Sequence, residues 1–320
     1  MWIMFKRSNY IVSMKTLFFP VLLLFSVFIA AAQKNDSTLQ IGKKVITLSE
    51  LVITNNLNIP RFIDHIKNDS SFYKAFRNLH ILGFSAINDI RMNNSDGEAK
   101  AYLHSKTRQT RSNDCRSMET LEEQAGGDIY DGDHNFNYYT AQMYASLFFT
   151  KDSVCGENNI VKGREFSTGG KSGMEKHKEQ LKMLFFNPGK KINGIPFISN
   201  KTAIFEEEMT TKYDMSIDVG IHNKTNCYIF KQVVKPKYKS EVVVDEMTTW
   251  FDDRNYEVLA RTYTLSYDAG FYDFKVQMEV QLSTFGKLLV PTLIRYTGNW
   301  KAIFKKRERG VFTALLYDFK

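Results

Sequence analysis

The feature that most constrains this chain is a strict two-residue alternation over residues 273–282. Apolar side chains alternate there with polar ones without a break, and the apolar set is Phe274, Val276, Met278, Val280 and Leu282. This period places one set on each face of a β-strand, so the apolar face must lie against other apolar groups. Burying these side chains would contribute roughly 1.5–3 kcal/mol each. Neighbouring segments repeat the pattern from residue 226 to the end, which predicts an antiparallel meander.

The N-terminal part predicts helices that pack against this meander. Asn58 can cap a helix that has Pro60 near its first turn and an apolar stripe of Phe62, Ile63 and Ile66. A similar stripe follows shortly afterwards, and further helical candidates lie in the middle of the chain. We expect an α+β fold that is mostly antiparallel, with about eleven strands and three or four helices.

Residues 111–173 lack a sustained pattern. Their composition shifts to Asn, Asp, Gly, Ser and charged residues, broken by a helical candidate over residues 138–149. We expect an irregular insertion within one domain of residues 33–320, because no repeat or low-complexity linker divides the chain. Strands are predicted from residue 202 onwards, beginning with residues 202–208.

Residues 1–32 have the composition of a signal peptide. Basic residues precede an apolar run over residues 17–29, and three alanines follow, ending at residue 32. We expect cleavage before Gln33 and export to the periplasm or outer envelope. A membrane anchor is the alternative, although the run is shorter than the roughly 20 residues that cross a bilayer. Met14 is a second possible start.

The net charge of the chain gives little information about its binding partners, except that it does not favour nucleic acid. The chain carries +8, and removal of residues 1–32 leaves +5, because that segment holds three basic and no acidic residues. This mild excess is scattered along the chain, and an exported domain rarely meets nucleic acid. We therefore expect no nucleic-acid partner, while peripheral contact with an anionic membrane stays open.

No segment carries a recognised catalytic spacing. Residues 166–172 end like a phosphate-binding loop, but Glu165 stands where that motif needs its first glycine. The histidines are scattered, and no nucleophile elbow is present. One run could offer oxygen ligands to a hard cation, although a solvated loop is favoured because the EF-hand spacing fails: Asp128, Asp131, Asp133, Asn135 and Asn137. We expect no cofactor, no metal site and no enzymatic activity.

The mature chain keeps three cysteines. Export permits disulfides, and Cys115 and Cys155 lie in predicted loops that flank the same helical candidate. We expect a bridge between them. Cys227 lies beside Tyr228 in a predicted strand, which suits a small buried apolar side chain.

A basic segment over residues 305–310 joins the last two predicted strands. It is predicted to be a charged hairpin tip, and its alternative role is contact with a lipid headgroup or partner, since Trp300 lies close by.

Aromatic and turn motifs gather between residues 213 and 300. They are Cys227-Tyr-Ile-Phe, Thr249-Trp250-Phe251-Asp252, Arg261-x-Tyr263-x-Leu265-x-Tyr267, Asp273-Phe274, Pro291 and Tyr296-x-Gly298-x-Trp300. This part resembles the outer-membrane lipoprotein-sorting proteins with a LolA/LolB-like fold, and the mature chain resembles a group of exported Bacteroidetes envelope proteins. The resemblance implies an open half-barrel of strands wrapped around helices, with an apolar cavity for acyl chains. The chain departs from those carriers in its greater length and in the insertion over residues 111–173.

We therefore expect a non-enzymatic lipid- or lipoprotein-binding protein of the bacterial envelope, with acyl chains held between the apolar face of the sheet and the helices. Candidate lining residues are Trp250, Phe274, Val276, Met278 and Val280. A structural scaffold with a packed interior is the alternative, because a filled half-barrel has the same sequence pattern. A secreted hydrolase is a third possibility.

Overall fold

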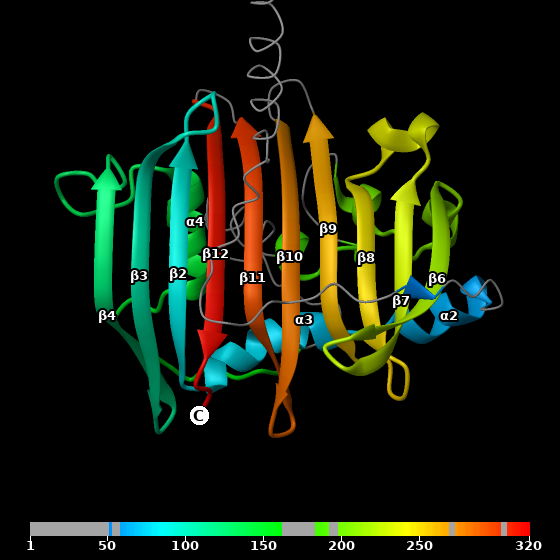
Figure 1. Cartoon of the computed structure of the whole chain (residues 1–320), viewed down its shortest axis with the longest axis horizontal. Coiled ribbons are helices and arrows are strands. Elements are labelled where there is room, and N and C mark those ends of the chain that lie inside the picture. Colours follow the sequence, from blue (N-terminus) through cyan, green and yellow to red (C-terminus); the bar gives the residue numbers. More distant parts are fainter. Residues whose placement is uncertain (1–50, 53–57, 162–182, 192–197, 269–272, 302–305) are drawn as a thin grey trace, which may run out of the picture. The chain divides into compact units, whose positions relative to one another are not determined.

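The computed structural model describes residues 51–52, 58–161, 183–191, 198–268, 273–301 and 306–320. These residues contain one antiparallel sheet of twelve strands in the order β1-β6-β7-β8-β9-β10-β11-β12-β2-β3-β4-β5 (Figure 1). The first and last strands of this order do not pair with each other, so the sheet is open. The predicted α+β fold, an open and mostly antiparallel half-barrel, is confirmed. The predicted signal peptide, residues 1–32, lies outside the described residues.

Most strands are long enough to span the whole height of the sheet (Figure 1). The strands are β1 Leu51–Val52, β2 Phe84–Asn93, β3 Ala99–Ser112, β4 Cys115–Gly127, β5 Ser153–Cys155, β6 Tyr213–His222, β7 Thr225–Val234, β8 Val244–Asp252, β9 Val258–Asp268, β10 Asp273–Phe285, β11 Leu288–Lys301 and β12 Glu308–Tyr317. The α-helices are α2 Ile59–Ile66, α3 Ser71–Asn78, α4 Tyr139–Phe148 and α6 Glu207–Thr210, and the 3-10 helices are η1 Leu79–Ile81, η2 Ser199–Thr202 and η3 Pro236–Glu241.

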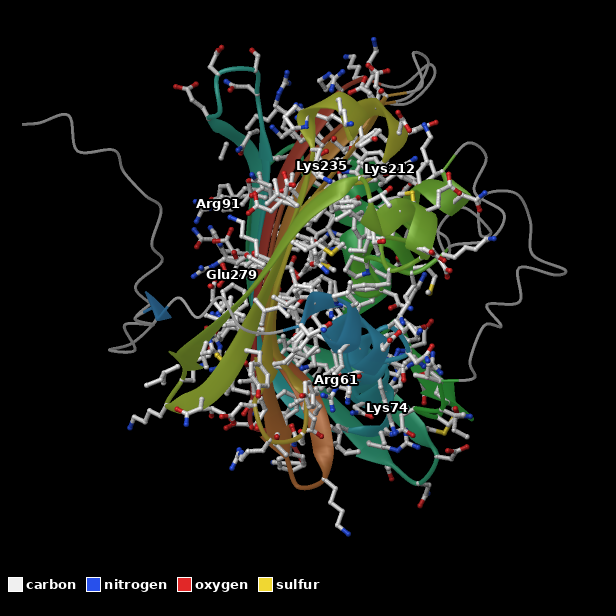
Figure 2. All side chains as sticks on the ribbon, turned by 90° about the vertical axis from the view of Figure 1, so that its right-hand side faces the viewer. Arg61, Lys74, Arg91, Lys212, Lys235 and Glu279 are labelled. Carbon is white, nitrogen blue, oxygen red and sulfur yellow. A yellow bond between two sulfur atoms is a disulfide. The ribbon has the colours of Figure 1, made fainter. Side chains whose placement is uncertain are left out.

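The alternation over residues 273–282 forms the centre of β10, between β9 and β11. Phe274, Val276, Met278 and Val280 are all buried in the main core, whereas Gln277 between them is exposed. The helices lie against this apolar side of the sheet, which we call the inner face (Figure 2). The predicted two-faced strand is confirmed.

Helix α2 begins where the sequence predicts. The side chain of Asn58 accepts a hydrogen bond from the Arg61 amide at 3.0 Å and so caps the helix. The stripe of Phe62, Ile63 and Ile66 is buried. Because a helix packs through its apolar stripe, α2 covers the inner face rather than standing free.

The rings that receive α2 come from two strands. The centroid of Phe62 lies 5.2 Å from that of Phe230 on β7 and 5.6 Å from that of Phe251 on β8. These separations are typical of aromatic pairs in protein cores. They fix α2 over the β7–β8 side of the sheet.

Two predictions of local structure are wrong. Residues 115–127 do not belong to an irregular insertion, because they form β4 and pair with β3 along their whole length. Most side chains of β4 are exposed, so the strand lacks the apolar alternation by which strands are detected. The expected strand over residues 202–208 is replaced by the end of η2 and the start of α6, with Ala203 and Ile204 buried between them. Residues 162–173 lie outside the described part of the chain.

Within the described residues, no helix combines the length and the apolar character needed to cross a bilayer.

Candidate functional site

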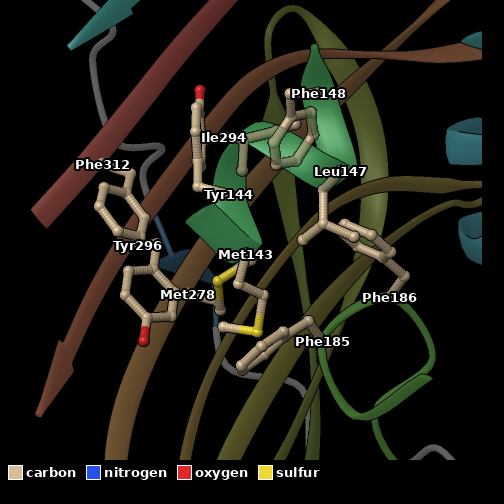
Figure 3. A pocket seen from close by; sticks show the side chains of 10 residues that line it. All are labelled: Met143, Tyr144, Leu147, Phe148, Phe185, Phe186, Met278, Ile294, Tyr296 and Phe312. Atoms are coloured by element: carbon tan, nitrogen blue, oxygen red, sulfur yellow. The ribbon is translucent and has the colours of Figure 1, made fainter. Parts of the chain in front are cut away.

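The interior beside Met278 is filled. The cavity at this position measures about 20 Å³, and its lining includes Met143, Phe185, Tyr296 and Phe312 (Figure 3). A space of that size holds roughly one water molecule, whereas ligand pockets usually measure about 300–1,000 Å³. Four of the five predicted lining residues, Phe274, Val276, Met278 and Val280, are therefore core residues here.

The fifth predicted lining residue, Trp250, does not lie on the inner face. It is paired with Ala260 on β9 and Ile229 on β7, whereas the next residue, Phe251, reaches the core. Trp250 is half-buried, and its ring lies 5.9 Å from His222. The prediction is wrong because adjacent aromatic residues on a strand point to opposite faces, and the pairing of β8 places Phe251 inside.

A larger space lies between α2 and the edge of the sheet. This cleft measures about 870 Å³, and we call it the α2 cleft. It lies between α2, residues 189–191, residues 203–207 and the start of β6. Its apolar lining consists of Ile59, Pro60, Ile63, Ala203, Phe205, Tyr213 and Met215. Its volume falls within the usual range for small-molecule sites, so it is the candidate functional site.

Charged side chains of both signs also line the α2 cleft. Most of them are exposed, whereas Ile63 and Tyr213 are buried. The cleft therefore has an apolar floor and a polar entrance, which suits an amphiphile. The charged residues are Asp64, Lys67, Lys190, Lys191, Glu206, Glu207 and Asp214.

Hydrogen bonds hold the loop that forms one wall of the cleft. The carbonyl of Lys190 accepts from the Thr202 hydroxyl at 2.8 Å, and the Lys190 ammonium donates to the carbonyl of Lys67. Burial lowers the pKa of Lys190, although Asp69 opposes that shift. Gly189 has a φ of 90°, where other residues are strained. These contacts hold residues 189–191 in place as one wall of the cleft.

The sequence did not indicate the α2 cleft. One wall comes from α2 and the others come from residues 189–215, more than a hundred residues later, and only the fold brings them together. The apolar stripe of α2 predicted its buried face, but not the space that remains beside it.

A second cleft, of about 630 Å³, lies at one end of β9, β10 and β11 and has a mainly polar lining. Arg307 lines it and donates two hydrogen bonds of 2.8 Å to Asp273 and one of 2.7 Å to Asn299. Bidentate pairing fixes the guanidinium. The contact predicted for residues 305–310 with a headgroup or partner stays a prediction.

The other candidate chemistry yields no assembled site in the described residues. No group of three or more His, Cys, Asp or Glu side chains there could hold a metal ion. The carboxylate of Asp131 accepts hydrogen bonds from the amides of Asp133 and Asn135, so it closes a turn. The loop over residues 166–172 lies outside the described residues.

Cys115 and Cys155 are joined by a disulfide in the structure. The two residues lie opposite each other on β4 and β5, rather than in the loops that were expected. Cys227 is fully buried, and burial raises its pKa to about 11. A thiol in that state is poorly reactive.

Comparisons with known proteins return structures but no sequence relatives. No family model matches the chain. No curated protein matches it either. One similar solved structure is a putative outer membrane lipoprotein-sorting protein domain from Vibrio parahaemolyticus, with 9% identity and a TM-score of 0.24, covering 76% of this chain and 88% of that one. Another is a DUF1329 family protein from Desulfovibrio piger ATCC 29098, with 12% identity and a TM-score of 0.22, covering 78% of this chain and 93% of that one.

The first neighbour belongs to the class that the sequence resemblance named. At these identities and TM-scores, neither likeness carries a conclusion about ligand or partner.

Proposed function

We propose that this protein is a non-enzymatic, exported lipid-binding protein of the bacterial envelope, and that it takes up an acyl chain in the α2 cleft. The observation that carries this proposal is a space of about 870 Å³ between a helix and the sheet, with an apolar floor and a charged entrance. The expectation that acyl chains lie between the helices and the sheet is kept, but their place moves from β10 to the edge of the sheet.

The chemistry of the cleft matches an amphiphile. Each methylene that leaves water against Ile59, Ile63, Phe205 or Met215 contributes about 0.8 kcal/mol. The charged entrance can remain in contact with a polar headgroup, so neither part of the ligand is placed in an unfavourable surrounding. The sequence resemblance to outer-membrane lipoprotein-sorting proteins supports the same ligand class.

Two variants on adjacent residues test the site. Met215→Lys places an ammonium in the cleft, and its long stem can bend towards the charged entrance, so the fold should survive. Ser216→Lys introduces the same residue at an exposed position of the same strand. We expect Met215→Lys to weaken binding of a fluorescent fatty acid at least tenfold and Ser216→Lys to leave it unchanged. Equal binding by both variants would show that the α2 cleft is not the site.

The packed surroundings of Met278 favour a second candidate function, an envelope scaffold. Native mass spectrometry of protein purified from its own membrane-bearing host separates the two. Stoichiometric bound lipid supports the carrier, and protein that remains bare under mild conditions supports the scaffold. N-terminal sequencing of the exported form, with Gln33 expected first, tests export and cleavage within the same preparation.

A further inference from the structure

Basic side chains that are scattered along the sequence gather at one end of the sheet. Residues 235–241 carry three lysines and one glutamate, and residues 306–309 carry three basic side chains and one glutamate. Both segments contribute to the lining of the second cleft, as does Lys275 on β10. Lys301 lies at the same end, because it is paired with Asp273 at the start of β10. We call residues 235–241, Lys275, Lys301 and residues 306–309 the basic end.

Three carboxylates in or beside the basic end are engaged within the fold. Asp273 accepts the two hydrogen bonds from Arg307, and Glu241 pairs with Lys212 at 2.9 Å. Glu308 accepts from two amides at the start of α4. These contacts use the acidic groups but only two of the cations, so most of the positive charge of the basic end is not neutralised by them.

Most lysines of the basic end are exposed. Asp268 also lines the second cleft, but basic side chains outnumber acidic ones in that lining even when it and Asp273 are included. The exposed lysines that form no ion pair within the described residues are Lys237, Lys239, Lys275, Lys301 and Lys306. The basic end therefore presents uncompensated positive charge to solvent.

The composition of this end fits a membrane surface better than a protein partner. Protein interfaces have an apolar centre and are depleted in lysine. The large apolar side chains that are exposed in the described residues lie elsewhere, since Ile221 and Phe285 are near turns at the opposite end of the sheet and Ile160 follows β5. A lipid surface instead offers many phosphate groups without fixed positions, which flexible lysines can reach.

The basic end adjoins the α2 cleft. Tyr213 begins β6 and lines that cleft, and Lys212 directly before it forms the ion pair with Glu241 of η3. The Lys235 amide donates to the carbonyl of Lys212 at 2.9 Å, and Figure 2 shows both lysines at the same end of the sheet. Contact of this end with a bilayer would therefore bring the α2 cleft close to the lipids.

We propose that the basic end docks on a bilayer that contains anionic phospholipids, and that its exposed lysines hold the lipid phosphates. The second cleft, of about 630 Å³, is lined by Lys239 and Lys275 and has room for a headgroup within this contact. Attraction between exposed charges and an anionic surface decays within a Debye length, so the contact is reversible and depends on salt. Docking goes beyond the proposed function, because it requires no ligand in the α2 cleft.

The test is flotation of the mature protein with vesicles of two compositions, phosphatidylcholine alone and an equal mixture of phosphatidylcholine and phosphatidylglycerol. We expect binding to the anionic vesicles to be at least about tenfold tighter and to be lost as the salt concentration is raised. A double variant, Lys239→Glu with Lys275→Glu, should weaken that binding at least about tenfold. Its matched control, Lys74→Glu with Lys287→Glu, changes the net charge equally at exposed positions on α3 and at the β10–β11 turn, and should bind like the wild type.

Urea unfolding shows whether the variants fold, and Lys239→Gln with Lys275→Gln replaces the first double variant if that variant does not. Equal binding of the wild type to both kinds of vesicle, or equal loss in the two double variants, would overturn the inference. Absence of vesicle binding would overturn it too, and retention of the wild type on immobilised poly-glutamate would then indicate an acidic protein partner. The fluorescent fatty acid should bind the first double variant as it binds the wild type, so docking and the α2 cleft are tested separately.

Discussion

Met278→Lys tests how completely the interior of the half-barrel is filled. Met278 is 5% exposed on the inner face of β10, beside a cavity of about 20 Å³. The matched control is Gln277→Lys, which places the same side chain one residue earlier, where β10 is exposed. The two variants have equal net charge and differ in the face that receives the ammonium.

The expected loss for Met278→Lys follows from two contributions. Removing the buried thioether side chain forfeits roughly 1.5–3 kcal/mol of burial. An unpaired ammonium held away from water costs several kcal/mol more, and the cavity has room for only about one water molecule to hydrate it. We therefore expect a loss of at least about 4 kcal/mol, a large part of the roughly 5–15 kcal/mol that stabilises a typical domain. Gln277→Lys should stay within about 0.5 kcal/mol.

Urea unfolding followed by tryptophan fluorescence measures both variants. A folded Met278→Lys protein whose free energy of unfolding lies within about 1 kcal/mol of the control would refute this reasoning. Such a result would mean that water reaches the side chain at residue 278. The interior would then have room that the cavity volume excludes, and acyl chains could lie against β10 after all.

Three further predictions concern other parts of the fold. Peptide mapping without reductant should show the peptides of Cys115 and Cys155 joined by a disulfide, and separate peptides would contradict the bridge. In the chain-entropy model, reducing this disulfide should lower the free energy of unfolding by roughly 3–4 kcal/mol. Glu308→Ala should destabilise the protein by about 1–2 kcal/mol, because the carboxylate accepts from two amides at the start of α4, and an unchanged urea midpoint would show that this cap is dispensable. Burial lowers the pKa of His80, so between its folded pKa and about pH 6.5 this side chain binds more protons in the unfolded state than in the folded state. The free energy of unfolding should therefore fall as the pH is lowered from 7 towards the folded pKa. His80→Gln should make the urea midpoint less dependent on pH over that range.

The sequence predicted those parts of the fold in which burial has a regular period. β10 and α2 each expose one face and bury the other, so their patterns of two and of 3.6 residues are visible without any knowledge of neighbours. β4 was missed because most of its side chains stay in solvent on both faces. The cysteine pair was predicted from its position along the chain, although both residues lie on strands.

The site was harder to predict than the fold. Trp250 and Phe251 are adjacent aromatic residues, and only the pairing of β8 with β9, with an irregularity between these two positions, decides which of them faces the core. The α2 cleft is a space left between elements, and volume between elements has no period in the sequence. Pattern therefore identifies the surfaces that are buried, but not where their packing is incomplete.

Two buried strands also carry a polar residue at an inward position. The inward positions of β7 are Tyr228, Phe230, Gln232 and Val234, so a glutamine occupies a phase that is otherwise apolar. Arg261 is likewise a polar residue at an inward position, on β9. The sequence pattern alone therefore does not distinguish the two residues.

The structure distinguishes Arg261 from Gln232 by the contacts of their side chains. Arg261 donates to Thr249, and its guanidinium lies 4.3 Å from the centre of the Phe72 ring, so packing and a hydrogen bond account for it within the fold. Gln232 has no such side-chain contact within the described residues, and leaving a buried amide unpaired costs about 1–3 kcal/mol. A polar residue at an inward strand position is thus explained by the fold where partners are present, as for Arg261, and is left unexplained where they are absent, as for Gln232.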